Sequence, residues 1–139
     1  QEYYPSSVLT ICTAAVSDFT PVDAEDKKLK KTSMTGTMSL QLEQTPDILA
    51  ALGAAKKPNQ KLVGFALETN NGEDYAKEKL VRKNADAIIL NMLSSKTGFE
   101  SNTNAVDIFF QDGGELSFEL MDKSLLGKQL LEALIEKFQ

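Results

Sequence analysis

The segment KLVGFALETNNGEDYAKEKLVRKNADAIILN, residues 61–91, decides the fold. It begins with an apolar run over residues 61–68, continues with apolar residues at helical spacing over 71–84, and closes with a second apolar run over 86–91. The two runs are typical of buried strands and the middle part of an amphipathic helix. The order strand, helix, strand favours a parallel pair with a right-handed crossover. Gly64 in the first run indicates a close backbone approach or a point of twist.

The sequence after this unit predicts a hairpin and a final helix. Residues 105–111 and 115–121 are strand-like, and Asp112-Gly113-Gly114 between them supplies glycines for the positive φ values of a tight turn. Residues 124–138 have the spacing of an amphipathic helix. Its predicted apolar stripe consists of Leu125, Leu126, Leu130, Leu131, Leu134, Ile135 and Phe138.

The sequence before residue 61 gives three further predictions. Residues 7–14 (SVLTICTA) are typical of a buried strand, whereas residues 15–31 lack periodicity and predict neither a strand nor a long helix. Residues 37–44 (TMSLQLEQ) alternate apolar and polar, as a half-buried strand does. Thr45 is expected to cap a helix that begins at Pro46 and runs to about Ala55.

Together these elements predict one α/β domain over residues 1–139, a three-layer Rossmann-like sandwich with a mostly parallel sheet and an antiparallel hairpin. A doubly wound sheet usually begins with a strand, a glycine-rich phosphate loop and a helix. This sequence starts at Gln1, almost directly in a strand, and no glycine-rich segment precedes it. We therefore expect it to be part of a longer protein whose N-terminal glycine-rich segment is not included.

Composition excludes several classes of function. The 139 residues carry a net charge of −5, which disfavours non-specific binding of nucleic acid because that binding needs an excess of clustered Lys and Arg. No apolar stretch approaches the roughly 18 residues of a membrane span, and no secretory signal is apparent, so a cytoplasmic protein is expected. The absence of histidine excludes nucleophiles activated by histidine and zinc sites of the His type. Cys12, the only cysteine, is expected to be a buried structural thiol.

Small residues and one carboxylate follow the first predicted strand. Ala14 and Ala15 allow a flat ring to approach the backbone, and Asp18 suits a hydrated Mg²⁺ bound to phosphates. In open α/β sheets ligands bind beyond the carboxyl ends of the strands, which is where these residues are expected. The alternative is that the alanines are packing residues and Asp18 caps a turn. Phe65, near the end of the second predicted strand, could contact a base or belong to the core.

A run of four lysines, Lys27, Lys28, Lys30 and Lys31, lies about ten residues further on. A lysine ammonium is a point charge that suits a polyphosphate, although such a run is also typical of a solvated turn. The combination of an aspartate at a strand end with a lysine in the same loop favours a Mg²⁺–nucleotide site.

Six segments, in this order and spacing, resemble the ligase part of the coenzyme A biosynthesis flavoproteins, the phosphopantothenate–cysteine ligase family. They are AAVSDF (14–19), KLKK (28–31), TPDIL (45–49), VGFALET (63–69), KNADAIILN (83–91) and GFESNTNAV (98–106). The resemblance implies a ligase that joins cysteine to 4′-phosphopantothenate through a CTP-derived acyl-cytidylate, with Mg²⁺ as cofactor and CTP as co-substrate.

The resemblance also implies roles for single residues. Lys28, which matches the first lysine of the family's KxKK motif, would bind the phosphates and stabilise charge as pyrophosphate leaves. Asp18 would bind near the metal or nucleotide, and Ala14, Ala15 and Phe65 would line the cytosine site. Such catalysis needs no histidine, because it depends on positioning and on stabilisation of phosphate charge.

The sequence departs from the family in two respects. It lacks the family's upstream Asn-x-Ser-Ser-Gly signature, and it lacks the fused decarboxylase with its catalytic histidine and FMN, so FMN is expected only if that domain is fused upstream. We therefore expect little ligase activity from these residues alone. A homodimer is expected, for which the 105–121 hairpin offers edge surface. Two other interpretations stay open: a non-catalytic α/β nucleotide-binding or dimerisation module, and a flavodoxin-like electron carrier, which the missing phosphate loop disfavours.

Overall fold

The computed structural model describes residues 2–23, 37–93 and 101–139. The chain divides into two compact units, one formed by residues 1–13 and 48–139 and the other by residues 14–47. The larger unit is an α/β sandwich. The smaller unit contains a two-stranded ribbon. Each unit has its own set of contacts and is described separately below.

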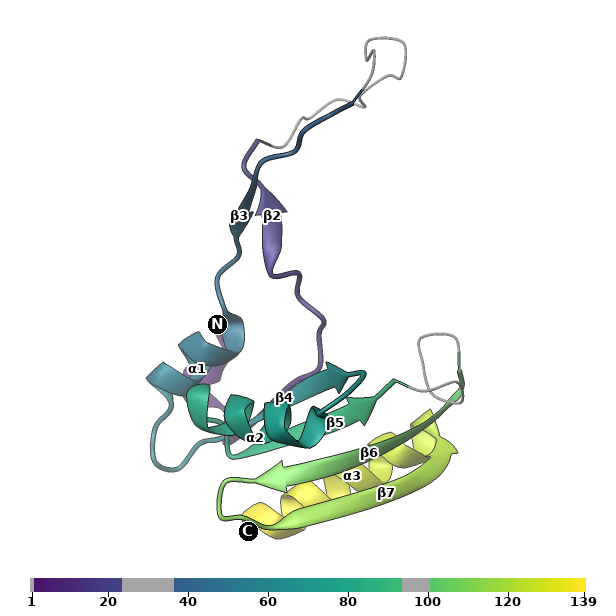
Figure 1. The fold of residues 1–139 in the computed structure, drawn as a ribbon. Coiled ribbons are helices and arrows are strands. Elements are labelled where there is room, and N and C mark those ends of the chain that lie inside the picture. The colour runs from purple at the N-terminus through teal and green to yellow at the C-terminus, as the bar shows by residue number, and fades with distance from the viewer. Residues whose placement is uncertain (1, 24–36, 94–100) are drawn as a thin grey trace. The chain divides into compact units, whose positions relative to one another are not determined.

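The larger unit is built on a five-stranded sheet with the order β1-β4-β5-β6-β7 (Figure 1). Its strands are β1 (Leu9–Cys12), β4 (Lys61–Glu68), β5 (Ala87–Met92), β6 (Thr103–Phe110) and β7 (Glu115–Asp122). The pairs β1–β4 and β4–β5 are parallel, whereas β5–β6 and β6–β7 are antiparallel. All strands except β6 therefore run in the same direction. The predicted mostly parallel sheet with an antiparallel hairpin is confirmed.

The strand–helix–strand segment over residues 61–91 forms as its sequence predicts. Helix α2 (Gly72–Arg82) connects the parallel strands β4 and β5. Gly64 marks a close approach, because a Cβ atom there would lie 2.6 Å from Leu49 Cδ2 and 2.9 Å from Ile88 Cδ1. Leu49 belongs to helix α1 (Ile48–Ala55), so the glycine lets this helix pack directly onto β4. The close approach predicted from the sequence is thus the correct interpretation of Gly64.

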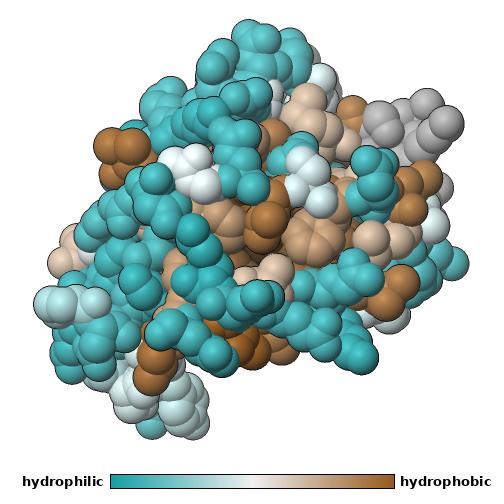
Figure 2. All heavy atoms as spheres, turned by 90° about the horizontal axis from the view of Figure 1, so that it is seen from below, coloured by the Kyte–Doolittle hydropathy of each residue, from teal (hydrophilic) through white to brown (hydrophobic). Residues whose placement is uncertain are grey.

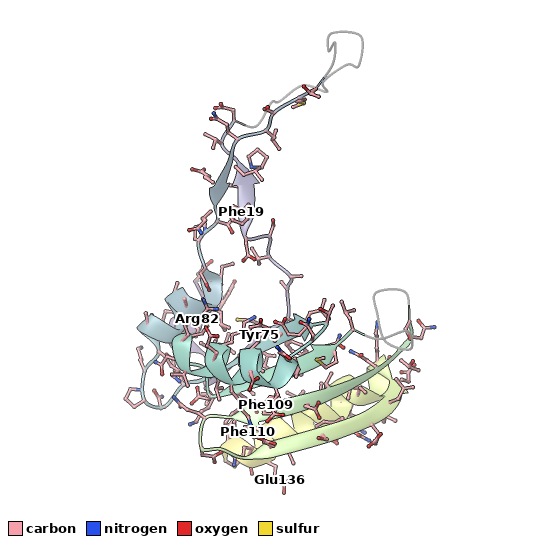
Figure 3. The ribbon with its side chains drawn as sticks, in the orientation of Figure 1. Phe19, Tyr75, Arg82, Phe109, Phe110 and Glu136 are labelled. Carbon is pink, nitrogen blue, oxygen red and sulfur yellow. The ribbon has the colours of Figure 1, made fainter. Side chains whose placement is uncertain are left out.

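Helices cover the sheet on both faces and make the three predicted layers. On one face, leucines of α3 (Lys123–Phe138) pack on Val63, Ala87 and Ile108, which we call the α3-side cluster. On the other face, Ala76 and Leu80 of α2 pack on Ile88 and Leu90, the α2-side cluster. The neighbouring residues Phe109 and Phe110 of β6 divide between the two clusters, since successive side chains of a strand point to opposite faces (Figure 3).

The apolar stripe of α3 is narrower than the sequence suggests. Leu126, Leu130 and Leu134 are buried at a spacing of four residues, and Phe138 packs beside them. The flanking Leu125, Leu131 and Ile135 are exposed, so their prediction as part of the packed stripe is corrected. A helix on one flat sheet face buries only the side chains that point straight down. Figure 2, seen from below, likewise shows apolar side chains among hydrophilic ones on an accessible face.

Strand β1 is an edge strand, and this corrects its predicted burial. It pairs only with β4, and all four of its residues are partly exposed. The N-terminal segment before it, with the short 3₁₀ helix Tyr4–Ser6, is anchored by the buried side chain of Gln60. The Gln60 amide nitrogen donates to the carbonyl oxygens of Tyr4 (2.7 Å) and Ser7 (2.8 Å). The Tyr4 hydroxyl donates in turn to the Leu52 carbonyl oxygen at 2.8 Å.

A buried carboxylate joins three elements of the larger unit. Asp86, just before β5, is 8% exposed, and its Oδ2 accepts from Lys56 Nζ at 2.7 Å and from the Leu62 main-chain N–H at 2.9 Å. Lys61 Nζ lies 3.5 Å from Oδ1. Burial of a charge is tolerated only where it is paired and hydrogen-bonded, and Asp86 meets both conditions.

The smaller unit differs from its prediction. Strand β2 (Phe19–Pro21) lies where no strand is expected, and it pairs antiparallel with β3 (Leu42–Gln44), which is shorter than the predicted strand 37–44 and fully exposed. Thr45 is not a helix cap: its hydroxyl donates to the Ser17 carbonyl oxygen and its N–H to that of Asp18. Helix α1 accordingly begins at Ile48 rather than at Pro46.

Candidate functional site

The parallel strands β1, β4 and β5 end at Cys12, Glu68 and Met92, and their carboxyl ends form one rim of the sheet. This is the rim at which open α/β sheets bind ligands. The residues predicted for the site follow or belong to these strands. They divide between the two structural units: Phe65 belongs to the larger unit, whereas Ala14, Ala15 and Asp18 belong to the smaller one.

Within the smaller unit, Ala14, Ala15 and Asp18 are all exposed. The main-chain oxygen of Asp18 accepts from Thr45 N–H at 3.0 Å, so the backbone at Asp18 is fixed by the start of the ribbon. The two alanines are exposed and therefore do not belong to the buried core of the described residues. Lys28 lies outside the described residues, as does the rest of its lysine run, so its predicted role stays a prediction.

Within the larger unit, Phe65 is partly buried and its side chain packs against the α3-side cluster. Its main-chain oxygen accepts a hydrogen bond from Lys79 Nζ of α2 at 2.8 Å. Sequence reasoning missed Lys79. The only signal for it is its place on the helix that follows β4, which does not reveal which carbonyl group its side chain reaches.

Two amide side chains near the same rim were also missed. Asn91 in β5 and Asn104 in β6 each have a buried side-chain oxygen that has no hydrogen-bond partner in the described part of the chain. Buried polar atoms are normally paired, so such an oxygen is available to a donor group of a ligand or to water. Asn91 is the last residue of the KNADAIILN motif, and its place at the end of an apolar run was the signal that could have identified it.

Cys12 is only half-buried, so its predicted full burial is corrected. Its thiol nevertheless has the low reactivity that is expected of a structural cysteine. Burial raises the pKa of its thiol above the ordinary value. The thiolate is the reactive form of cysteine, and a raised pKa keeps the thiol protonated at neutral pH. Cys12 is therefore poorly suited to act as a nucleophile.

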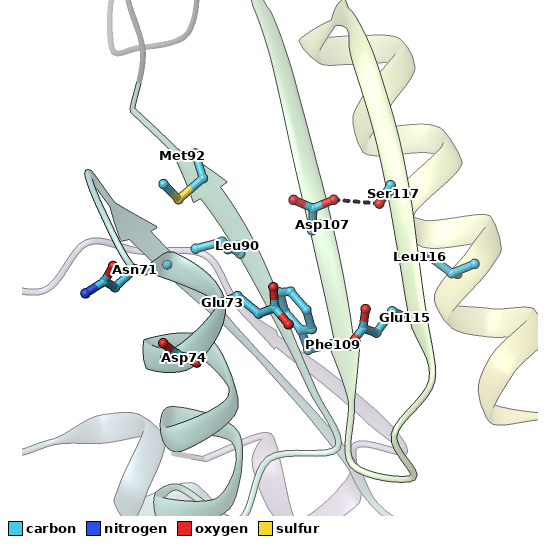
Figure 4. Close-up of a pocket in the computed structure, with 11 residues that line it drawn as sticks. Asn71, Glu73, Asp74, Leu90, Met92, Asp107, Phe109, Glu115, Leu116 and Ser117 are labelled. Carbon is cyan, nitrogen blue, oxygen red and sulfur yellow. Dashed lines mark hydrogen bonds between the residues drawn. The ribbon is translucent and has the colours of Figure 1, made fainter.

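A groove of about 540 Å³ lies on the larger unit between the first turn of α2 and the strands β5, β6 and β7, and it borders the rim at Met92 (Figure 4). Its apolar lining consists of Leu90, Met92, Phe109 and Leu116. Its polar lining includes the carboxylates Glu73, Asp74, Asp107 and Glu115, and Ser117 donates to Asp107 at 2.7 Å. Among the predicted site residues that the structure describes, Ala14, Ala15, Asp18 and Phe65, none lines it.

The charge of this groove disfavours a triphosphate. The described residues that line the groove include no Lys or Arg, and the adjacent Lys77 is already held by Glu73 and Glu115, each at 2.7 Å. Hydrogen bonds to Glu115 and Glu73 raise the pKa of Lys77, so its charge is committed to those carboxylates. A polyphosphate would meet a net negative charge there, because the one charge of Lys77 offsets only part of the charge of the four carboxylates. The part of the rim at β1 and β4, rather than the groove beside β5, is thus the better candidate for a nucleotide.

Over residues 2–23, 37–93 and 101–139 the structure shows no group of three or more Cys, Asp and Glu side chains able to hold a metal ion by themselves. In the same part of the chain, no helix has the length and hydropathy needed to cross a membrane.

Comparison with known proteins gives consistent matches over nearly the whole chain. The family model described as "DNA/pantothenate metabolism flavoprotein C-terminal domain" matches residues 1–138. The Coenzyme A biosynthesis bifunctional protein CoaBC of Bacillus subtilis (strain 168) is 45% identical over 130 residues, which cover 93% of this chain and 31% of that protein. The chain thus spans about a third of the length of the curated relatives it matches.

Solved structures give the same result for the fold. The crystal structure of the C-terminal domain of a CoaBC protein has a TM-score of 0.73 and 32% identity, and the match covers 96% of this chain and 56% of that one. A Cab2 mutant solved in complex with phosphopantothenate-cysteine has a TM-score of 0.62 at 21% identity, covering 94% of this chain and 44% of that one. The latter likeness is one of fold.

Proposed function

Because this chain belongs to the DNA/pantothenate metabolism flavoprotein C-terminal domain family, we propose that it is part of a ligase that joins cysteine to 4′-phosphopantothenate in coenzyme A biosynthesis. We propose further that activation proceeds through a CTP-derived acyl-cytidylate, with CTP, cysteine and 4′-phosphopantothenate as substrates. The observation that carries the proposal is the family match over residues 1–138, together with 45% identity to a CoaBC protein across 93% of the chain.

The chemistry of the chain is compatible with this reaction. A carboxylate must first be joined to a nucleotide phosphorus with loss of pyrophosphate, and the cysteine amine then displaces CMP. Both steps depend on orientation and on stabilisation of phosphate charge rather than on an enzyme nucleophile. In the proposal, Lys28 stabilises the departing pyrophosphate, and Ala14, Ala15 and Phe65 line the cytosine site. The protonated thiol of Cys12 takes no part in either step.

Asp18 suits the proposed Mg²⁺. Magnesium in nucleotide sites is usually held by one or two carboxylates together with phosphate oxygens and water, so a complete protein cage is not needed. The carboxylate of Asp18 is exposed on a backbone fixed by the Asp18–Thr45 hydrogen bond. When bound there, the ion would neutralise phosphate charge, and Asp18 would hold it in place.

Calorimetric titration of the chain with CTP in the presence of Mg²⁺ tests the proposal. We expect saturable binding, and we expect it to weaken by about tenfold in Asp18→Asn because one charge-assisted contact is lost. Asp23→Asn, also exposed in the smaller unit, is the matched control and should bind like the wild type. If neither this chain nor the intact gene product that contains it binds CTP, the ligase proposal is wrong and a non-catalytic module is favoured.

We also propose that the protein is a homodimer and that residues 14–47 contribute to the interface. Several described apolar side chains of this unit are exposed, among them Phe19 (51%), Leu40 (56%) and Leu42 (51%). A two-stranded ribbon with exposed apolar side chains is marginally stable by itself in water, so a second copy is a suitable partner for it.

Replacement of an apolar residue on this surface by lysine should therefore produce monomers. We expect Leu42→Lys to shift the molar mass, measured by size-exclusion chromatography with light scattering, from dimer to monomer. Leu120→Lys is the matched control, since Leu120 is similarly exposed (47%) but lies on β7. A dimer lost only in Leu120→Lys would place the interface on the hairpin instead, and a wild-type monomer would exclude both surfaces.

A further inference from the structure

Two asparagines in the described part of the chain have a left-handed backbone, Asn71 with a φ of 47° and Asn84 with a φ of 49°. Asn71 is the N-cap residue of α2, and Asn84 follows the C-terminal end of the same helix. Asparagine tolerates this backbone region better than most residues other than glycine. The backbone conformation therefore accounts for the choice of asparagine at both positions.

The two asparagines differ in how their side-chain amides are held. Asn84 Nδ2 donates to the Gly53 carbonyl oxygen at 2.9 Å, and the next main-chain nitrogen, that of Ala85, donates to the Leu80 oxygen at 3.1 Å. The side chain of Asn71 is exposed and makes no capping hydrogen bond to the first turn of α2. Figure 4 shows it pointing away from β6 and β7. The amide of Asn71 is thus accessible and is not fixed by the helix that it precedes.

Gly72 places a main-chain nitrogen directly after this amide. Gly72 is the first residue of α2, and the first four N–H groups of a helix have no partner within the helix. A Cβ atom at Gly72 would collide with Met92 Sδ and lie 3.0 Å from Leu90 Cδ1, so the close packing of α2 on β5 favours glycine here. Without a Cβ atom, glycine also leaves its own nitrogen open to approach. The fold therefore selects an Asn-Gly pair whose side-chain carbonyl and main-chain nitrogen the helix does not engage.

We propose that Asn71 is a site of spontaneous deamidation. The Gly72 nitrogen attacks Asn71 Cγ, a new N–Cγ bond forms, and the Cγ–Nδ2 bond breaks. Nδ2 leaves as ammonia and takes the proton of the Gly72 N–H, so the product is a cyclic succinimide. Water then opens the ring at either carbonyl, which gives aspartate where the new bond is cleaved and isoaspartate where the original main-chain bond is cleaved. One water is consumed and one ammonia is released, and the inference is independent of the proposed function.

The two products differ in their effect on α2. Aspartate keeps the original main chain and adds a negative charge at the N-terminus of the helix, where such a charge is favourable. Isoaspartate lengthens the main chain before Gly72 by one carbon and moves the original carbonyl group off the chain as a carboxylate. That carbonyl oxygen accepts the Tyr75 N–H at 3.2 Å, so this first bond of the helix is disrupted. We therefore expect isoaspartate, and not aspartate, to loosen the first turn of α2.

Peptide mapping by mass spectrometry tests the site. The folded chain would be incubated in buffer, and fragmentation that separates aspartate from isoaspartate would follow positions 71 and 84 in the same sample. We expect both products at position 71 and unchanged asparagine at position 84. Asn71→Gly keeps a residue that suits the positive φ and removes the amide, so its peptide should show no product. In the matched control Asn70→Gln, the products at position 71 should remain.

Three outcomes would contradict the inference. Unchanged Asn71 in the folded chain overturns it, even if the chain unfolded in urea reacts at that residue, because the start of the helix would then protect the amide. Equal reaction at Asn71 and Asn84 would show that the contacts of Asn84 do not separate the two positions. For the structural effect, Asn71→Asp should unfold at the urea concentration of the wild type and the purified isoaspartate form at a lower one. Equal unfolding curves for these two forms would refute the loosening of α2.

Discussion

Asp86→Ala is expected to lower the free energy of unfolding by about 3–5 kcal/mol, because removal of one partner leaves a buried charge unpaired. The ammonium of Lys56 is almost as buried as Asp86, with side-chain exposures of 11% and 10%. The substitution also removes the acceptor of the Leu62 main-chain N–H, which is buried in β4. Few single substitutions in this chain break a charge pair and a strand contact together.

Urea unfolding followed by circular dichroism at 222 nm measures this effect. Asp86→Asn should lose less than Asp86→Ala, since the amide oxygen still accepts from Leu62 N–H while the ion pair is lost. Asp74→Ala, an exposed carboxylate on α2, is the matched control and should cost less than about 1 kcal/mol. If Asp86→Ala lowers the free energy of unfolding by less than about 1 kcal/mol, Asp86 does not link α1, β4 and β5 as proposed.

Lys28→Gln is expected to lower kcat of the ligase reaction by about a hundredfold to a thousandfold, with little change in stability. If Lys28 stabilises the charge that develops as pyrophosphate leaves, its removal costs as much as loss of one preorganised donor in other enzymes. The effect should be larger on kcat than on KM, because the charge is greatest in the transition state.

The neighbouring Lys27 provides the control. Lys27→Gln makes the same change one residue before the KLKK motif, so it should alter kcat by less than about threefold. Lys28→Arg should recover only part of the activity, since a guanidinium does not reproduce the compact charge of an ammonium. Equal losses in Lys27→Gln and Lys28→Gln would indicate that the lysine run acts only through its total charge.

The sheet and its helices were predictable because local and long-range signals agree. The apolar runs of β4 and β5, the helical spacing of α2 and the glycine turn of the hairpin each indicate the element that the structure contains. The partial exposure of β1 was not predictable, because an apolar run does not reveal whether a strand has one neighbour or two. Strand β2 was missed because three residues that include Pro21 form a strand only by pairing with residues about twenty positions later.

The candidate site was predictable in part. The motif AAVSDF and the lysine run predict a site at Asp18 and Lys28 without coordinates, and these roles stay predictions. The contact of Lys79 with the Phe65 carbonyl oxygen could not be found in this way, because it depends on which main-chain group lies at the end of the β1–β4 ladder. That depends on where β1 ends relative to β4, which is a property of the register between strands.

The attachment of the N-terminal segment to Gln60 has a consequence for how the molecule opens. Chain ends usually fray independently of the core, but Tyr4 and Ser7 are bonded to a buried amide between α1 and β4. Amide protons of β1 should therefore exchange with solvent only in the large opening events that also expose the centre of the sheet. In this respect an edge strand held on one side behaves as part of the same cooperative unit as the strands inside.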